Sequence, residues 1–151
     1  MPEPWATRLV LEGGGTVLVD EADLWPDGAF VTTHLIVAPD YLSSRSANVR
    51  ALLEGLLEAV DVANGDPAAA QATTNDGIEA VTTKRLGDET MVGAWERLTF
   101  TADPIVGSLQ GSAEDAVSVG LLEPVDLEGI YDLTLLNGLL AERGAAPVVG
   151  L

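Results

Sequence analysis

The chain has 151 residues, enough for one domain with a sizeable core, and its 47% hydrophobic content excludes a disordered protein. Its 24 acidic and 7 basic residues give a formal net charge of −17, so we expect no nucleic-acid partner and no anionic membrane surface. The sequence contains no cysteine, which excludes disulfides, thiolate catalysis and cysteine-based metal sites.

The first elements predicted from the sequence are short. Residues 4–12 are expected to form a helix that the glycines at 13–15 end. Because these glycines follow a helix instead of a strand, they do not have the arrangement of a phosphate-binding loop. Residues 16–19 are predicted to be a short strand. Residues 20–28 form a loop whose acidic residues lack the alternating spacing of a calcium site.

The strongest strand signal lies at residues 30–37, which are rich in β-branched, aromatic and aliphatic side chains. Its last three residues form a continuous apolar run, which is typical of a strand covered on both faces. Pro39 is expected to end this strand, because proline has no amide hydrogen for a ladder. We therefore predict that this strand is the hub around which the chain is organised.

Five further helices are predicted after this strand from apolar periodicity and capping residues. They cover 46–65, 67 to about 85, 88 to about 98, 105 to about 120, and 132 or 134 to 144. The polar residues 73–77 weaken the second of these, and 98–101 is a short extended piece. Residues expected to start helices are Ser46, Asp66, Asp88 and Asp103. Side chains expected to face the core are Val49, Leu52, Leu53, Leu56, Val60, Ala63, Val92, Trp95 and Leu98.

The chemistry-bearing residues indicate binding in preference to catalysis. A Ser-His-Asp site would need His34, the only histidine, which sits in an apolar strand where histidine is usually structural. We therefore expect no enzyme activity, no catalytic residue, no metal site and no cofactor. Trp25 could cover the edge of the core or reach a ligand. Trp5 lies at a helix start, where free amides could meet an anion beside the flat indole, although simple packing is an equally good interpretation.

Five stretches together resemble one protein family. They read PEPWATRLV at 2–10, LVDEADLWPDGAFVTTHLIV at 18–37, AWERLTFTADP at 94–104, SLQGSAEDAVSVGLL at 108–122 and DLEGIYDLTLLNGLLAERG at 126–144. They are similar to the C-terminal half of the solute-binding proteins of ABC importers for nitrate, sulfonate and taurine-like ligands. The aliphatic-sulfonate branch is the most similar.

The resemblance implies an α/β fold that is part of a two-lobed periplasmic-binding-protein-like structure, helix-rich with few strands in this fragment. Residues 1–20 would finish the second lobe, 21–29 would be the return crossing that acts as a hinge, and 30–151 would be the C-terminal part of the first lobe. The candidate ligand-binding residues that follow from this placement are Glu3, Trp5, Thr32, Thr33 and His34.

The resemblance also implies partners and a location. The ligand would be a small anionic solute such as an aliphatic sulfonate, taurine or nitrate, and an ABC permease would receive it. Intact members are extracytoplasmic, either periplasmic or membrane-anchored. This sequence shows neither an export signal nor the family's lipid-anchor cysteine and N-terminal half, so we expect a fragment, a truncated reading frame or one half of a split protein. The location of such a fragment stays open.

The sequence also predicts self-association and leaves two alternative functions open. Because a strand at 30–37 needs neighbouring strands for its backbone groups, we predict that the isolated chain forms a homo-oligomer. One alternative function is that of a thiamine-pyrimidine biosynthesis protein of the same fold, which depends on a cysteine-rich, metal-linked motif and several histidines. The other alternative is a helical interaction module without a small-molecule ligand.

Overall fold

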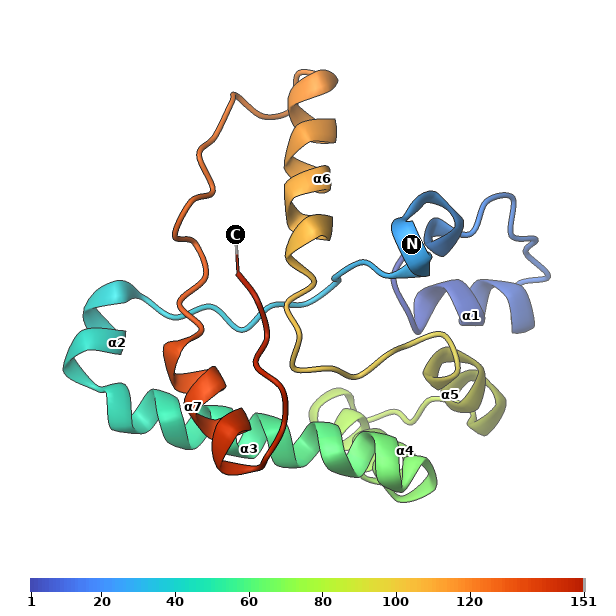
Figure 1. The fold of residues 1–151 in the computed structure, drawn as a ribbon. Helices are drawn as coiled ribbons and strands as arrows, with labels where there is room; N and C mark the ends of the chain where they lie inside the picture. The colour runs from blue at the N-terminus through green and yellow to red at the C-terminus, as the bar shows by residue number, and fades with distance from the viewer. Residues whose placement is uncertain (151) are drawn as a thin grey trace. The chain divides into compact units, whose positions relative to one another are not determined.

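The computed structural model describes residues 1–150, and every regular element within them is a helix (Figure 1). Seven α-helices and two short 3₁₀ helices are present in this range. In chain order they are α1 (Trp5–Leu11), η1 (Glu21–Leu24), η2 (Pro26–Gly28), α2 (Pro39–Ser44), α3 (Ser46–Gly65), α4 (Pro67–Thr82), α5 (Asp88–Trp95), α6 (Val106–Ser118) and α7 (Thr134–Glu142).

The chain forms two compact units. Unit 1 comprises Met1–Val19 and Leu57–Thr101, and unit 2 comprises Asp20–Leu56 together with the residues from Ala102 onward. The α3 helix therefore contributes its first part to unit 2 and its last part to unit 1.

In unit 1, α5 packs against both α1 and α4. The predicted glycine stop of α1 is confirmed, because the carbonyl of Leu9 accepts hydrogen bonds from the amides of Gly13 at 3.2 Å and Gly15 at 2.8 Å. At the contact between α1 and α5, a Cβ atom on Gly93 would lie 3.1 Å from Cγ2 of Thr7. A larger side chain at this position would therefore push the two helices apart.

The α4 helix begins as the sequence predicts and continues through the weak region. Asp66 is its N-cap and accepts a hydrogen bond from the amide of Ala69 at 3.1 Å, and Pro67 occupies the first helical position. Residues 73–77 are helical, so the polar stretch does not interrupt α4.

One buried side chain of α4 fixes the connection that leads to α5. Asn75 is 3% exposed, its Nδ2 donates to the carbonyl of Leu86 at 3.0 Å, and its Oδ1 accepts from the Leu86 amide at 2.8 Å. A single side chain thus satisfies both backbone groups of a residue outside any helix, as buried polar groups require.

In unit 2, the core is built on α7 and the first part of α3. Leu136, Leu139 and Leu140 of α7 are buried, as is Val49 of α3. Arg50, which follows Val49 in α3, forms an ion pair of 2.6 Å with Glu142, which lies two residues after Leu140 in α7. In the described part of the chain, α7 contributes more buried leucines than any other helix.

A second asparagine repeats the arrangement of Asn75. In α7, Asn137 donates from Nδ2 to the carbonyl of Val148 at 3.0 Å and accepts from the Val148 amide at 2.9 Å. This pair of bonds holds the segment after α7 against the helix.

Trp25 packs against α6 within unit 2. Its ring stacks on Phe30 with the centroids 5.9 Å apart, and its Nε1 donates to a carboxylate oxygen of Glu21 at 3.0 Å. A Cβ atom on Gly111 of α6 would lie 3.0 Å from the indole ring. Of the two interpretations for Trp25, the structure therefore shows the structural one, in which the indole covers a helix.

Both predicted strands are wrong, because residues 1–150 contain no strand. Residues 16–19 and 30–37 are connections between helices (Figure 1). The prediction that a strand at 30–37 is the hub of the chain is therefore also wrong. A strand-forming composition gives a strand only when a second strand pairs with it, and the described chain offers none. Pro39 ends this segment by starting α2, a helix that is not among the predicted ones.

Several predicted details of helix starts and faces are also corrected. Gly87, not Asp88, is the N-cap of α5, and Ile105 with a φ of 47° precedes α6 in place of an aspartate cap. The carboxylate of Asp103 accepts instead from the Ile105 amide at 2.8 Å. Because residues 1–150 contain no sheet for the helices to cover, some side chains expected in the core are exposed, namely Leu52, Leu56, Val92 and Leu98.

The buried amide of Asn75 provides a test of the fold. We expect Asn75→Ala to lower the free energy of unfolding of unit 1 by about 2–3 kcal/mol, because it leaves two backbone groups of Leu86 without partners. Denaturant unfolding of both proteins measures the change in free energy, and hydrogen exchange of the Leu86 amide reports the loss of its bond. The matched control is Asn64→Ala, which removes an exposed bond to the carbonyl of Phe100 and should change stability by less than about 1 kcal/mol. Equal effects of the two substitutions would contradict the assignment.

Candidate functional site

The carboxylate of Glu3 occupies the start of α1. Its Oε2 accepts a hydrogen bond from the amide of Thr7 at 3.1 Å, and its Oε1 lies 3.2 Å from Nε of Arg97. The side chain of Glu3 is 8% exposed, so this carboxylate serves the fold of unit 1. The amides of Trp5 and Ala6 donate to the carbonyl of Pro2. The free amides that the sequence suggested at this helix start are therefore not available to an external anion.

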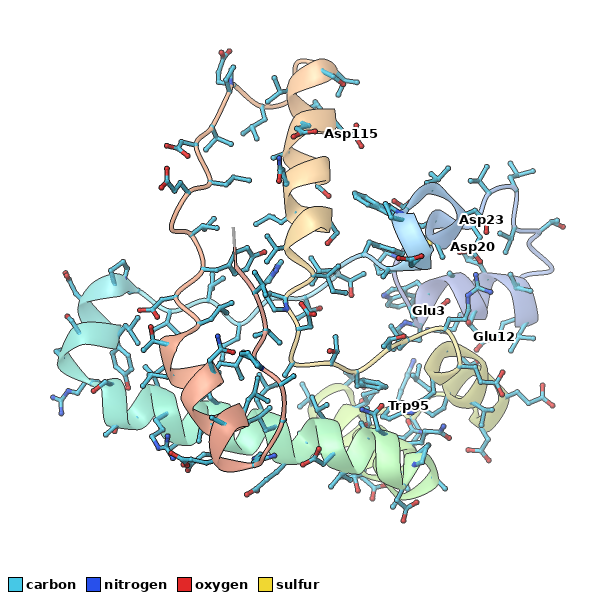
Figure 2. All side chains as sticks on the ribbon, in the orientation of Figure 1. Glu3, Glu12, Asp20, Asp23, Trp95 and Asp115 are labelled. Carbon is cyan, nitrogen blue, oxygen red and sulfur yellow. The ribbon has the colours of Figure 1, made fainter. Side chains whose placement is uncertain are left out.

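Trp5 instead presents an exposed indole next to a cation. Its residue surface is 55% exposed, and the guanidinium carbon of Arg8 lies 5.1 Å from the ring centroid. Arg8 also forms an ion pair of 3.0 Å with Glu12, which accepts a further bond from the hydroxyl of Thr90 at 3.1 Å. Trp5, Arg8 and Glu12 form a row along α1, the helix that runs between the labelled Glu3 and Glu12 in Figure 2.

The carboxylate of Glu12 is held in its ionised form by this row. The hydrogen bond from Arg8 lowers the pKa of Glu12 most, and the bond from the Thr90 hydroxyl lowers it further. The Arg8 guanidinium is thus partly neutralised, although one of its faces lies over the ring of Trp5.

The second part of the predicted site, residues 32–34, lies in unit 2. Thr32 and Thr33 are exposed, whereas His34 is half-buried. The Nε2 atom of His34 and the hydroxyl of Tyr131 are 2.9 Å apart, and their rings are tilted with centroids at 5.6 Å. Burial raises the pKa of Tyr131, so its hydroxyl stays protonated and the histidine keeps a structural partner.

The structure gathers the five predicted residues into two groups. Glu3 and Trp5 belong to unit 1, and Thr32, Thr33 and His34 belong to unit 2. The single concave surface that would join the two groups stays a prediction, as does the assignment of 1–20, 21–29 and 30–151 to the parts of two lobes.

Sequence reasoning missed the two arginines beside the first group. Arg8 could have been found, because it lies three residues after Trp5 and four before Glu12, which are the spacings of helical neighbours. Arg97 could not have been found, since it reaches Glu3 only through the packing of α5 against α1.

The described residues give no sign of a metal centre or of a membrane span. No group of three or more His, Asp or Glu side chains among residues 1–150 is placed to hold one ion. Within the same range, no helix combines the length and the apolar character needed to cross a bilayer.

The first 75 residues indicate the class of protein. They match a family of the nitrate/sulfonate/taurine-binding superfamily, whose fold is of the periplasmic-binding-protein-like α/β type. The family is the NMT1-like family, and the match covers residues 1–75, just under half of the chain. The expected fold class is thereby confirmed, with the described residues as a helix-rich part of it. No curated protein and no solved structure matches the chain.

The family match covers every candidate residue. Residues 1–75 include Glu3 and Trp5 in unit 1 and the 32–34 segment in unit 2. The match is consistent with a solute-binding protein of ABC transporters, and members of the family are typically extracellular. The second half of the chain, with α5, α6 and α7, lies outside the matched stretch.

The lowered pKa of Glu12 gives a test of the row along α1. A carboxylate whose pKa is depressed by folding stabilises the protein above its unfolded pKa, and this contribution is lost as the pH falls through the folded pKa. We therefore expect the stability difference between the wild type and Glu12→Gln to be present at about pH 7 and to vanish by about pH 2. Thermal unfolding of both proteins across this range measures it.

The control for this test is Glu58→Gln, which changes an exposed glutamate of α3 in the same unit. At about pH 7 it should change the thermal unfolding less than Glu12→Gln does, because no ion pair or hydrogen bond is lost with it. A difference for Glu12→Gln that is the same at every pH would contradict the ion pair as its source.

Proposed function

We propose that this chain is the C-terminal portion of the substrate-binding component of an ABC transporter that imports a small anionic solute, such as an aliphatic sulfonate, taurine or nitrate. The observation that carries the proposal is the NMT1-like match over residues 1–75, which contains every candidate site residue. The proposed partners are an ABC permease and the part of the binding protein that completes the cleft, and the proposed location is extracytoplasmic.

The exposed face of α1 suits such a solute. The indole of Trp5 offers a flat apolar wall for an alkyl chain, and the Arg8 guanidinium offers N–H donors in a planar fork that fits sulfonate or nitrate oxygens. An anion would compete with Glu12 for Arg8, which favours weak and reversible binding.

We further propose that the chain binds without catalysing a reaction. The Nε2 atom of His34 is hydrogen-bonded to the hydroxyl of Tyr131, an arrangement that fits a structural histidine better than a general base. The two alternatives, a thiamine-pyrimidine biosynthesis protein and a helical module without a small ligand, remain in competition. Thermal-shift measurements with sulfonates, taurine, nitrate and pyrimidines separate them.

Self-association is the last part of the proposed function. Within the described chain, the backbone amides of residues 32–37 have no hydrogen-bond partner, whereas the neighbouring amide of Val31 donates to Ser108 Oγ at 3.0 Å. Ile36 in this segment is 86% exposed, and residues 29–38 carry no Asp, Glu, Lys or Arg. An uncharged segment with unpaired amides can approach its own copy despite the net charge of −17, and we propose that two copies pair there.

Solute binding can be measured by calorimetry with taurine, ethanesulfonate and nitrate. We expect dissociation constants of about 1 mM for the chain alone and at least about tenfold weaker binding for Trp5→Ala, which removes the apolar wall. His34→Gln should change the affinity by less than about tenfold, or ~1.4 kcal/mol. The control is Trp25→Phe, since Trp25 is packed on Gly111. Absence of binding, or an unchanged affinity in Trp5→Ala, would contradict the proposed site.

Self-association can be measured by light scattering coupled to size-exclusion chromatography. We expect the wild type to be a dimer or larger and Ile36→Lys to be monomeric, because a lysine on each copy places like charges across the paired segments. Val81→Lys is a closely matched control, since Val81 is also β-branched and 86% exposed but lies on α4. A wild-type monomer, or equal dissociation by both substitutions, would exclude pairing at residues 32–37.

A further inference from the structure

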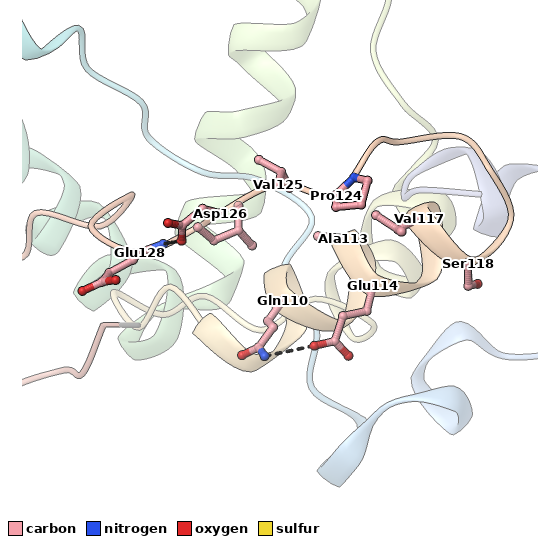
Figure 3. A pocket seen from close by; sticks show the side chains of 10 residues that line it. Gln110, Ala113, Glu114, Val117, Ser118, Pro124, Val125, Asp126 and Glu128 are labelled. Atoms are coloured by element: carbon pink, nitrogen blue, oxygen red, sulfur yellow. Dashed lines mark hydrogen bonds between the residues drawn. The ribbon is translucent and has the colours of Figure 1, made fainter.

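A groove in unit 2 lies outside both the candidate site and the stretch that matches the family. One wall comes from α6, whose residues at positions 110, 113, 114 and 117 have the spacing of one helical face. The other wall is the irregular segment 124–128, which passes beside the helix (Figure 3). The groove has a volume of about 560 Å³ and is open to solvent. We propose that this groove binds a basic, amphipathic segment of a partner protein.

The lining of the groove is mostly apolar. Its apolar residues are Ala113, Val117, Pro124, Val125 and Leu127. Exposed apolar side chains continue along the chain on both sides of segment 124–128, at Val119, Leu121 and Ile130, which are 69%, 83% and 56% exposed. Clustered apolar exposure of this kind marks a surface that binds another molecule. Because the exposed residues extend beyond the groove itself, we infer a polypeptide partner larger than a small molecule.

The rim of the groove is acidic and has no cationic partner of its own. Glu114, Asp126 and Glu128 contribute its carboxylates. Glu114 accepts only from the side-chain amide of Gln110 at 3.0 Å, and Asp126 accepts from the backbone amide of Glu128 at 2.9 Å. None of the three forms an ion pair with any residue in the described part of the chain.

The sequence around the groove strengthens this negative field. Residues 98–142 contain eight acidic residues and no lysine, arginine or histidine; the acids are Asp103, Glu114, Asp115, Glu123, Asp126, Glu128, Asp132 and Glu142. Such a field attracts cations and repels anions. It therefore excludes the anionic solute as the occupant of this groove, and it disfavours a second copy of the chain, which carries a net charge of −17.

The charge and the lining together define the occupant. Apolar side chains at helical spacing would fill the groove between α6 and segment 124–128, while Lys or Arg residues flanking them would pair with the rim carboxylates. This inference does not depend on the identity of the solute, because the candidate site and the groove share no residue.

The test uses a dye-labelled peptide of about 14 residues in which leucines recur every three or four positions and lysines fill the positions between them, so that the leucines share one face of a helix. A scrambled peptide of the same composition is the comparison. Fluorescence anisotropy measures the affinity of the whole chain for each. We expect the patterned peptide to bind at least about tenfold more tightly than the scrambled one, and we expect this binding to weaken as salt rises. Equal binding of the two peptides, or no binding of either, would overturn the proposal.

Substitutions locate the binding surface. We expect Glu128→Lys on the rim and Val125→Ser in the groove each to weaken the affinity for the patterned peptide by about fivefold or more. The control Glu58→Lys makes the same change in net charge on α3 in unit 1 and should have less than about a twofold effect. Equal losses for Glu58→Lys and Glu128→Lys would show attraction by net charge alone and would overturn the groove. Displacement of the peptide by an equal concentration of free arginine would likewise overturn the proposal that the groove binds a polypeptide.

Discussion

The structure depends on the need of every buried backbone amide and carbonyl for a hydrogen-bond partner. The helices satisfy most of this need within themselves, but the connections between them find no sheet to join in the part of the chain that the structure describes. In each unit one asparagine side chain supplies these partners. Asn75 donates to the carbonyl and accepts from the amide of Leu86, and Asn137 does the same for Val148. Each asparagine side chain uses one N–H as donor and its oxygen as acceptor, as a residue of a neighbouring strand would, so it substitutes locally for a strand that the described chain does not have.

The same constraint explains which parts of the fold the sequence could predict. Helix starts depend on local chemistry, and the Asp66–Pro67 pair marks the start of α4 correctly. The strand predicted at 30–37 is absent because strand formation needs a distant partner, which the residue pattern within the segment cannot reveal. The candidate site follows the same division. Trp5 and its helical neighbour Arg8 are readable from spacing, whereas the contact between Arg97 and Glu3 arises only from tertiary packing.

The chain presents two surfaces of different chemical character. On α1, an aromatic ring and a guanidinium face outward together, and the carboxylate of Glu3 is turned into the fold. Along α6 and segment 124–128, the carboxylates face outward and the apolar lining lies between them. The carboxylates of the groove disfavour an anion, whereas on α1 the only carboxylate beside the guanidinium, that of Glu12, is ion-paired with it, so the two surfaces suit ligands of different chemistry.

The absence of basic residues around the groove has a practical consequence for chemical analysis. Trypsin cleaves only after lysine or arginine, so a complete digest releases residues 98–143 as one peptide that contains the entire lining of the groove. Amine-reactive cross-linkers find no lysine in this peptide, whereas carbodiimide coupling can join its carboxylates to lysines of a bound protein. Any partner captured in this way would be recovered on a single, long and strongly acidic fragment.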